Sequence, residues 1–167
     1  GSYRYIHNRG AITANGHMDG ETVLSGSLRR FDLPDPTLDP AELRTAWFEG
    51  SATMLDRVPE RVTAPLLGHA FRAVIGRNAF SLALIGPPGS YKTSLAAKVM
   101  HHFGELWDHN RPVSSMSGNG DTFNTVRLKL HQAKDVLYWL DDFAPTKSWL
   151  EAQKLLEETS RLIHNQE

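Results

Sequence analysis

The strongest constraint on the fold is an apolar segment, residues 79–85, that runs directly into a loop rich in glycine and proline. The loop is followed by Lys92, Thr93 and a largely apolar stretch, 94–100, that suits a helix. A glycine-rich turn between a strand and a helix directs successive backbone N–H groups inward, and these form a nest for a phosphate. The sequence therefore predicts a strand over 79–85, a phosphate-binding loop, and a helix over 92–104.

The loop follows the Walker A pattern, G-x-x-x-x-G-K-[ST], with one departure. Lys92 is expected to reach the β- and γ-phosphates of a nucleotide, and the Thr93 hydroxyl is expected to bind Mg²⁺. Tyr91 stands where the pattern has glycine, so its backbone either keeps ordinary dihedral angles or bears strain. Its ring either stacks on adenine or lies in solvent. The predicted nucleotide-binding residues are Gly86, Pro87, Pro88, Gly89, Ser90, Tyr91, Lys92, Thr93 and Ser94.

A second apolar segment, 136–140, ends in two carboxylates, Asp141 and Asp142. This is the form of a Walker B strand, and its nearly continuous apolar character is typical of a parallel strand covered on both faces. Asp141 is expected to hold Mg²⁺, usually through water. Asp142 is expected to orient or deprotonate the attacking water, so that Lys92 and Asp142 are the predicted catalytic residues.

Composition excludes several classes of site. The chain of 167 residues has no cysteine, which excludes disulfides and thiolate metal sites. The formal net charge is −1, so no global charge attracts nucleic acid or an anionic membrane, and any contact with DNA must come from a local patch or a fuller assembly. No apolar run reaches membrane-spanning length and no signal peptide is visible, which favours a cytoplasmic protein without a membrane partner.

Three segments are predicted along the chain. Residues 1–38 form a β-rich appendage and a proline-rich linker, with strands over 3–7 and 21–28 and the linker from Phe31 onward. Residues 39–77 form a brace of two helices, over 40–55 and 64–75. Residues 78–167 form the nucleotide-binding core. Its further predicted elements are a strand over 112–116, a helix after Asp121-Thr122 to about 132, and a helix from a capping box at Ser148 to about 164.

Alternating strands and helices in the core predict an α/β fold with a parallel sheet. With the Walker A and Walker B patterns, we expect this fold to be that of a P-loop NTPase of the RecA-like, additional-strand type. In that class a further strand follows the Walker B strand in sequence. The residues after Asp142 read as helix, and we therefore expect a sheet that is truncated at its carboxyl end. The alternative is a sheet in which the Walker A and Walker B strands pair directly, as in small-molecule kinases.

From about residue 66 to 166 the chain resembles a family of P-loop ATPases encoded by actinobacterial phages, prophages and integrative plasmids. That family is related to the helicase-like ATPase domains joined to primases in mobile-element replication proteins. The most specific match is the Asp-Asp-Phe-Ala-Pro-Thr signature that begins at Asp141. The other matching residues are those of the loop, Phe103-Gly104, Ser114-Ser115-Met116-Ser117, Asp121-Thr122-Phe123-Asn124 and Lys134-Asp135.

The resemblance implies Mg²⁺-dependent ATP hydrolysis coupled to work on DNA in a ring-shaped homo-oligomer. It also implies a basic stretch and an arginine finger beyond the helix that ends near Gln166. Two alternatives stay open at this point. One is a small-molecule or nucleotide kinase, and the other is a degenerate P-loop module that mediates assembly without hydrolysis.

Overall fold

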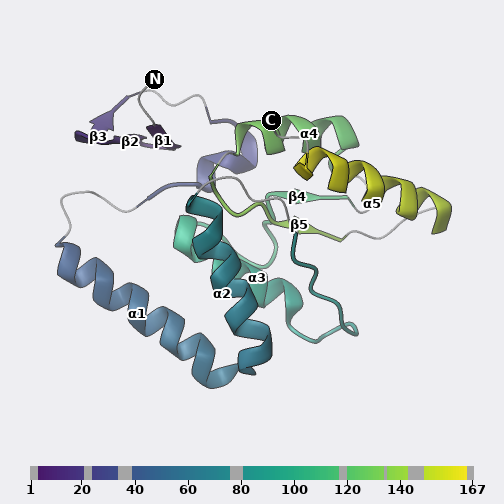
Figure 1. Ribbon diagram of the computed structural model, residues 1–167, viewed down its shortest axis with the longest axis horizontal. Helices are drawn as coiled ribbons and strands as arrows, with labels where there is room; N and C mark the ends of the chain where they lie inside the picture. The colour runs from purple at the N-terminus through teal and green to yellow at the C-terminus, as the bar shows by residue number, and fades with distance from the viewer. Residues whose placement is uncertain are drawn as a thin grey trace.

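The computed structural model of the chain describes residues 4–20, 24–33, 39–75, 81–116, 120–133, 135–142 and 149–164. It is mixed α/β, with a three-stranded antiparallel sheet, β1–β2–β3, and a two-stranded parallel sheet, β4–β5 (Figure 1). None of the described helices is long and apolar enough to cross a membrane. The elements in chain order are β1 (Arg4–His7), β2 (Gly10–Thr13), β3 (Gly16–Asp19), the 3₁₀ helix η1 (Gly26–Arg30), α1 (Pro40–Arg57), α2 (Glu60–Val74), α3 (Lys92–Met100), the 3₁₀ helix η2 (His101–Phe103), β4 (Ser114–Ser115), α4 (Phe123–Gln132), β5 (Leu140–Asp141) and α5 (Trp149–His164).

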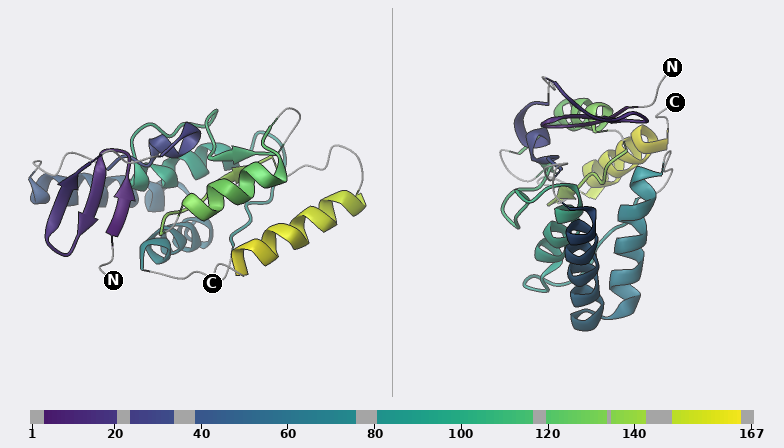
Figure 2. Two further views of the ribbon diagram at one scale, coloured as in Figure 1. Left: turned by 90° about the horizontal axis from the view of Figure 1, so that it is seen from above. Right: turned by 90° about the vertical axis from the view of Figure 1, so that its left-hand side faces the viewer.

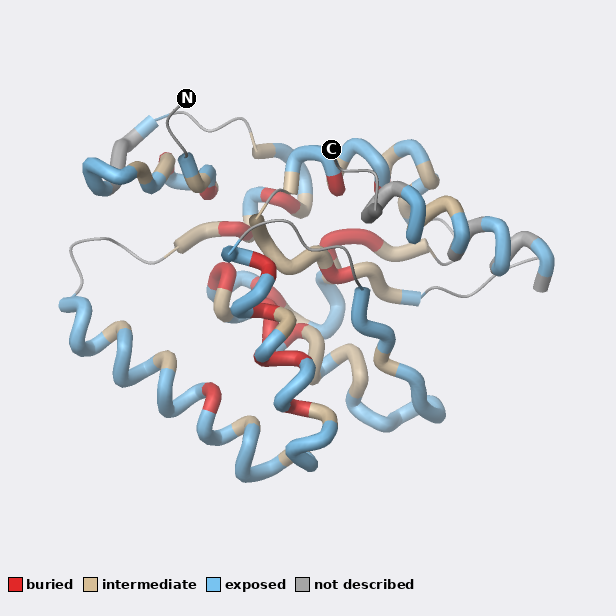
Figure 3. Tube along the Cα trace, in the orientation of Figure 1, coloured by how far each residue is buried: buried red, intermediate tan, exposed pale blue. Residues whose placement is uncertain are grey.

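One hydrophobic core joins η1, α2, α3 and the segments that lead into β4 and β5. Buried positions gather on α2, on the second half of α3 and around β4 (Figure 3). Trp107, Val99 and Met100 are each at most 1% exposed. The core draws on all three of the predicted segments, because Leu28 and Phe31 pack in the same cluster as residues of α2 and α3. The cluster consists of Leu28, Phe31, Leu66, Ala70, Ala73, Ala97, Val99, Met100, Phe103, Trp107, Val113 and Trp139.

The predicted helices are confirmed, with small shifts at their ends. Helix α1 begins at Pro40 after Asp39, whose side chain accepts the Ala41 N–H at 2.8 Å. Helix α2 begins four residues earlier than predicted, at Glu60. Helix α4 follows its predicted cap, Thr122, whose hydroxyl accepts the Thr125 N–H. Helix α3 is shorter than predicted and continues into η2, while α5 occupies its predicted span. The capping residue Ser148 lies outside the described residues.

The predicted strand before the loop is wrong over the residues that the structure describes. Residues 81–87 have no regular secondary structure and pair with neither sheet, and 79–80 lie outside the described part of the chain. Ile85 is 93% exposed and Leu82 is 39% exposed. A continuous apolar run suits a strand only when neighbouring strands and covering layers bury it. In the described chain the parallel sheet consists of β4 and β5 alone, and residues 81–87 pair with neither strand.

The predicted Walker B strand is shorter than its apolar run. Only Leu140 and Asp141 lie in a strand, and they pair in parallel with Ser114 and Ser115 of β4. The predicted strand over 112–116 is likewise reduced to β4. The partner of β5 is therefore the strand after α3, and in the described chain β5 does not pair with the segment that precedes the loop. The direct pairing of Walker A and Walker B strands, considered above as an alternative, is not found.

The amino-terminal segment folds differently from the prediction after its first sheet. The strand predicted over 3–7 is present as β1, which pairs with β2 in an antiparallel register that places Tyr5 opposite Ile12. The strand predicted over 21–28 is wrong where it is described, because Gly26–Arg30 form the 3₁₀ helix η1. Gly26 turns the chain with a φ of +57°, and Leu28 enters the core. Phe31, placed at the start of the linker, is only 3% exposed. The sheet β1–β3 lies at the far end of the molecule from the loop before α3 (Figures 1 and 2).

Candidate phosphate-binding site

The predicted phosphate loop forms a turn that leads directly into α3. Gly89 has a φ of +76°, a left-handed conformation that glycine adopts without steric cost. Tyr91 is the residue that precedes the helix, and it is also left-handed, with φ 57° and ψ 20°. A left-handed conformation strains a residue that has a Cβ, and glycine at this position would avoid that strain. The departure from the Walker A pattern therefore places backbone strain at Tyr91.

The side chain of Lys92 turns back over the loop. Its Nζ donates to the carbonyl oxygens of Gly86 at 2.9 Å and Pro87 at 2.8 Å, and to Ser90 Oγ at 3.2 Å. Ser90 Oγ in turn donates to the Pro87 carbonyl at 2.8 Å. The ammonium group is therefore held at the mouth of the loop, beside the first turn of α3.

An open pocket of about 330 Å³ lies at this place, lined by six consecutive residues from Gly89 to Ser94. Pro87 and Pro88 have no backbone N–H, and the lining begins with the next residue, Gly89. From Gly89 onward each lining residue has a backbone N–H that can donate a hydrogen bond. The first residues of α3 add N–H groups that have no acceptor within the helix. The Leu95 N–H is bonded to the Tyr91 carbonyl at 2.9 Å, so the helical ladder begins there.

The side chains that line the pocket differ in how far they are exposed to solvent. Tyr91 is 80% exposed and Ser94 is exposed, whereas Lys92 and Thr93 are half-buried. The Tyr91 ring thus lies in solvent. Thr93 stands in the first helical turn beside Lys92 and lines the same pocket. The lysine, the hydroxyl and the positive end of the helix dipole suit an anion such as a phosphate.

The structure does not bring the two predicted carboxylates into this pocket. Asp141 and Asp142 stand at the end of β5, and neither lines the pocket. The loop projects away from the end of β5 (Figure 1). Asp141 is half-buried, and its carbonyl accepts the Met116 N–H at 3.3 Å, while Asp142 is exposed with a φ of 49°. The described residues also hold no group of three or more histidines, aspartates or glutamates near enough to share a metal ion.

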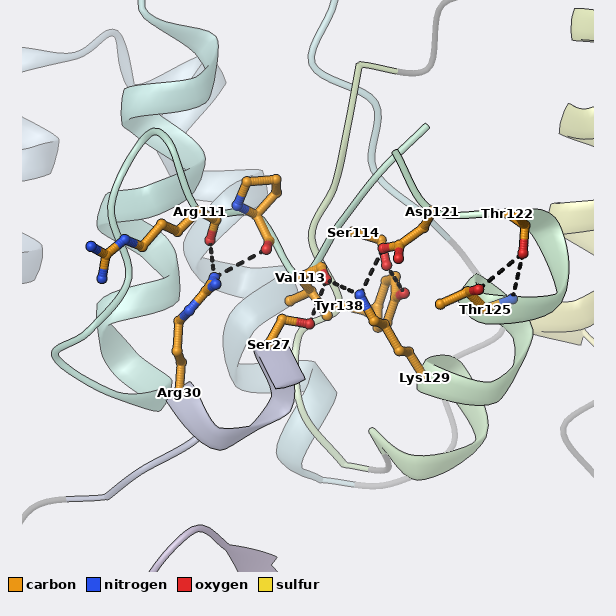
Figure 4. Close-up of polar contacts among 11 residues, drawn as sticks. Ser27, Arg30, Arg111, Val113, Ser114, Asp121, Thr122, Thr125, Lys129 and Tyr138 are labelled. Carbon is orange, nitrogen blue, oxygen red and sulfur yellow. Dashed lines mark hydrogen bonds and ion pairs between the residues drawn. The ribbon is translucent and has the colours of Figure 1, made fainter. Parts of the chain in front are cut away.

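A polar cluster between β4 and α4 was missed in the sequence (Figure 4). Ser114 is 1% exposed, and its Oγ lies 2.6 Å from the Tyr138 hydroxyl. Lys129 Nζ contacts Asp121 Oδ2 at 2.7 Å and donates to the Val113 carbonyl at 3.0 Å. The signal for this cluster was the presence of a serine and a tyrosine in two segments read as buried strands, because buried hydroxyls require partners.

The same cluster changes the acidity of its tyrosine. Burial raises the pKa of Tyr138 to about 12; the hydrogen bond with Ser114 acts in the opposite direction, and the negative charge of Asp121 adds to the rise. Tyr138 therefore stays a neutral phenol at physiological pH. The cluster serves to join β4, α4 and the residues before β5, and it does not share residues with the phosphate loop.

Comparison of the chain with protein families, with curated proteins and with solved structures gave no match in any of the three.

Proposed function

We propose that this chain binds a nucleoside triphosphate, ATP with Mg²⁺, through the loop 86–91 and the first turn of α3. The observation that supports this most directly is the position of Lys92. Its ammonium group stands at the edge of an open pocket lined by Gly89–Ser94, where backbone N–H groups and the helix dipole also favour negative charge. In the bound state, Lys92 would contact the β- and γ-phosphates, and Thr93 would bind Mg²⁺.

The resemblance extends this proposal to catalysis. In that extension Asp141 binds Mg²⁺ through water, Asp142 activates the attacking water, and hydrolysis drives work on DNA within a ring of identical chains. For these roles the end of β5 must approach the pocket. The separation of Asp141 and Asp142 from the pocket lining instead favours a second candidate. In it the chain is a module that binds the nucleotide but does not hydrolyse it by itself.

The test of binding is calorimetric titration with a non-hydrolysable ATP analogue and Mg²⁺, carried out on the wild type and on Lys92→Ala. Loss of a charge-assisted contact with phosphate should weaken binding by at least about tenfold, or about 1.4 kcal/mol. Lys98→Ala is the matched control, because Lys98 lies exposed on the same helix outside the pocket. Equal affinity of the wild type and Lys92→Ala would overturn the proposal.

The test of hydrolysis compares the wild type with Asp142→Asn, with and without DNA. If this chain hydrolyses ATP by itself, phosphate release should require Mg²⁺ and should fall by about 100-fold or more in the variant, the usual contribution of a group that positions or deprotonates water. Tight binding without release of phosphate would support the second candidate.

A further inference from the structure

The loop itself engages the ammonium group of Lys92. Nζ of Lys92 lies within hydrogen-bond distance of three loop acceptors, the carbonyls of Gly86 and Pro87 and the hydroxyl of Ser90. We call this arrangement the closed loop. A phosphate oxygen in the pocket competes with these loop acceptors for Lys92.

A side chain at Gly86 would crowd the closed loop at Ser90. A Cβ added there would lie 3.0 Å from Ser90 Oγ and 3.7 Å from Lys92 Cδ. The Ser90 hydroxyl and the lysine stem therefore occupy the space over Gly86. Ser90 is the central member of the network, because it donates to the Pro87 carbonyl and accepts from Lys92.

We propose that the closed loop is a self-inhibited form of the site, and that Ser90 holds Lys92 in it until a polyphosphate replaces the loop acceptors. This inference rests on the proposed function, since the loop must bind phosphate for its closure to matter. The Ser90 hydroxyl is a positioning group for Lys92, and its removal should make the lysine available. Ligand entry and release of Lys92 from the loop are then one coupled event.

The first measurement is the rate at which Lys92 is acylated by a water-soluble reagent in the ligand-free chain, followed by peptide mass mapping. Lys98, exposed on the same helix, is the internal reference. We expect Lys92 to react more slowly than Lys98 in the wild type. Ser90→Ala should raise the Lys92 rate by about two- to tenfold, the range that corresponds to loss of one ordinary hydrogen bond. Ser160→Ala, at an exposed position of α5, should change nothing.

The second measurement is the association rate of inorganic pyrophosphate and of Mg²⁺–ATP with the same proteins. Ser90→Ala should bind both probes about two- to tenfold faster than the wild type does. An unchanged Lys92 acylation rate in Ser90→Ala, or unchanged or slower association, would overturn the inference. Acylation could rise as expected while neither probe binds to the wild type or to any variant. That result would overturn the proposed function, and with it the inference that a polyphosphate opens the closed loop. In that case the closed loop remains only a structural contact.

Discussion

Tyr91 shows the steric cost of a side chain in the predicted phosphate loop. Three non-glycine residues in the described chain have positive φ angles, Tyr91, Asp135 and Asp142. Aspartate tolerates the left-handed region because its short polar side chain can bond locally, whereas tyrosine has no such compensation. Tyr91 is also 80% exposed, so little burial of its ring offsets the strain.

Tyr91→Gly should therefore stabilise the chain. We expect a gain of about 0.5–1 kcal/mol in the free energy of unfolding, because glycine adopts a φ near 57° without the steric cost of a Cβ. Tyr91→Ala, which keeps the Cβ and removes the ring, is the control and should give no gain. Urea denaturation measures both. A loss of stability in Tyr91→Gly would show that the ring makes contacts worth more than the strain.

At the scale of elements, the helices were predictable because their signals are local. The caps of α1 and α4 are Asp39 and Thr122, and each accepts a backbone N–H of its own helix, as the sequence indicated. Strands depend on partners that local sequence does not identify. The apolar run at 81–85 therefore read as a strand although no neighbour pairs with it, and β5 is shorter than its apolar run.

Only part of the candidate site could be predicted from the sequence. The loop, Lys92 and Thr93 follow from the order of residue types, and the structure brings them together at one pocket. The inward bonds of Lys92 were not predictable, because their acceptors are mainly backbone carbonyls whose direction depends on the fold of the loop. The distance between Asp141 and the loop depends in turn on how the strands pair.

The bond between Ser114 and Tyr138 links β4 to the residues before β5, and its effect should be visible at alkaline pH. The folded chain holds the pKa of Tyr138 at about 12, above the value of about 10 for an exposed tyrosine. The neutral phenol therefore stabilises the fold fully below about pH 10, and this contribution is lost as the pH rises towards 12.

Absorbance titration of tyrosinate tests this directly. The chain has four tyrosines, and Tyr138→Phe should remove an ionisation that occurs well above pH 10. The thermal stability of the variant should also decline less steeply above pH 10 than that of the wild type. An unchanged alkaline end of the titration would mean that Tyr138 ionises like an exposed tyrosine.

At the scale of the whole molecule, the amino-terminal segment is part of the core. Ser27 Oγ donates to the Val113 carbonyl at 2.7 Å, and the guanidinium of Arg30 lies 5.2 Å from the centre of the Trp107 ring. Phe31 packs on the same tryptophan, with ring centres 5.0 Å apart. These contacts join η1 to the segment that leads into β4, so the two should unfold together.

Phe31→Ala should lower the free energy of unfolding by about 3–5 kcal/mol, the usual cost of removing a buried aromatic side chain. Phe48→Ala is the matched control, because Phe48 is 62% exposed and its removal should cost about 1 kcal/mol or less. Urea denaturation followed by tryptophan fluorescence gives both values. Equal, small effects of the two substitutions would show that the amino-terminal segment does not contribute to the core.

The most direct test of the central claim is a titration of the ¹⁵N-labelled chain with Mg²⁺–ATP, followed by the backbone amide signals. Binding of phosphate by the loop predicts that the largest shifts occur at the six consecutive amides from Gly89 to Ser94, and that Lys92→Ala reduces them. Amides of β1–β3, at the far end of the molecule, should not move. Shifts centred elsewhere, or no shifts at saturating nucleotide, would contradict the account.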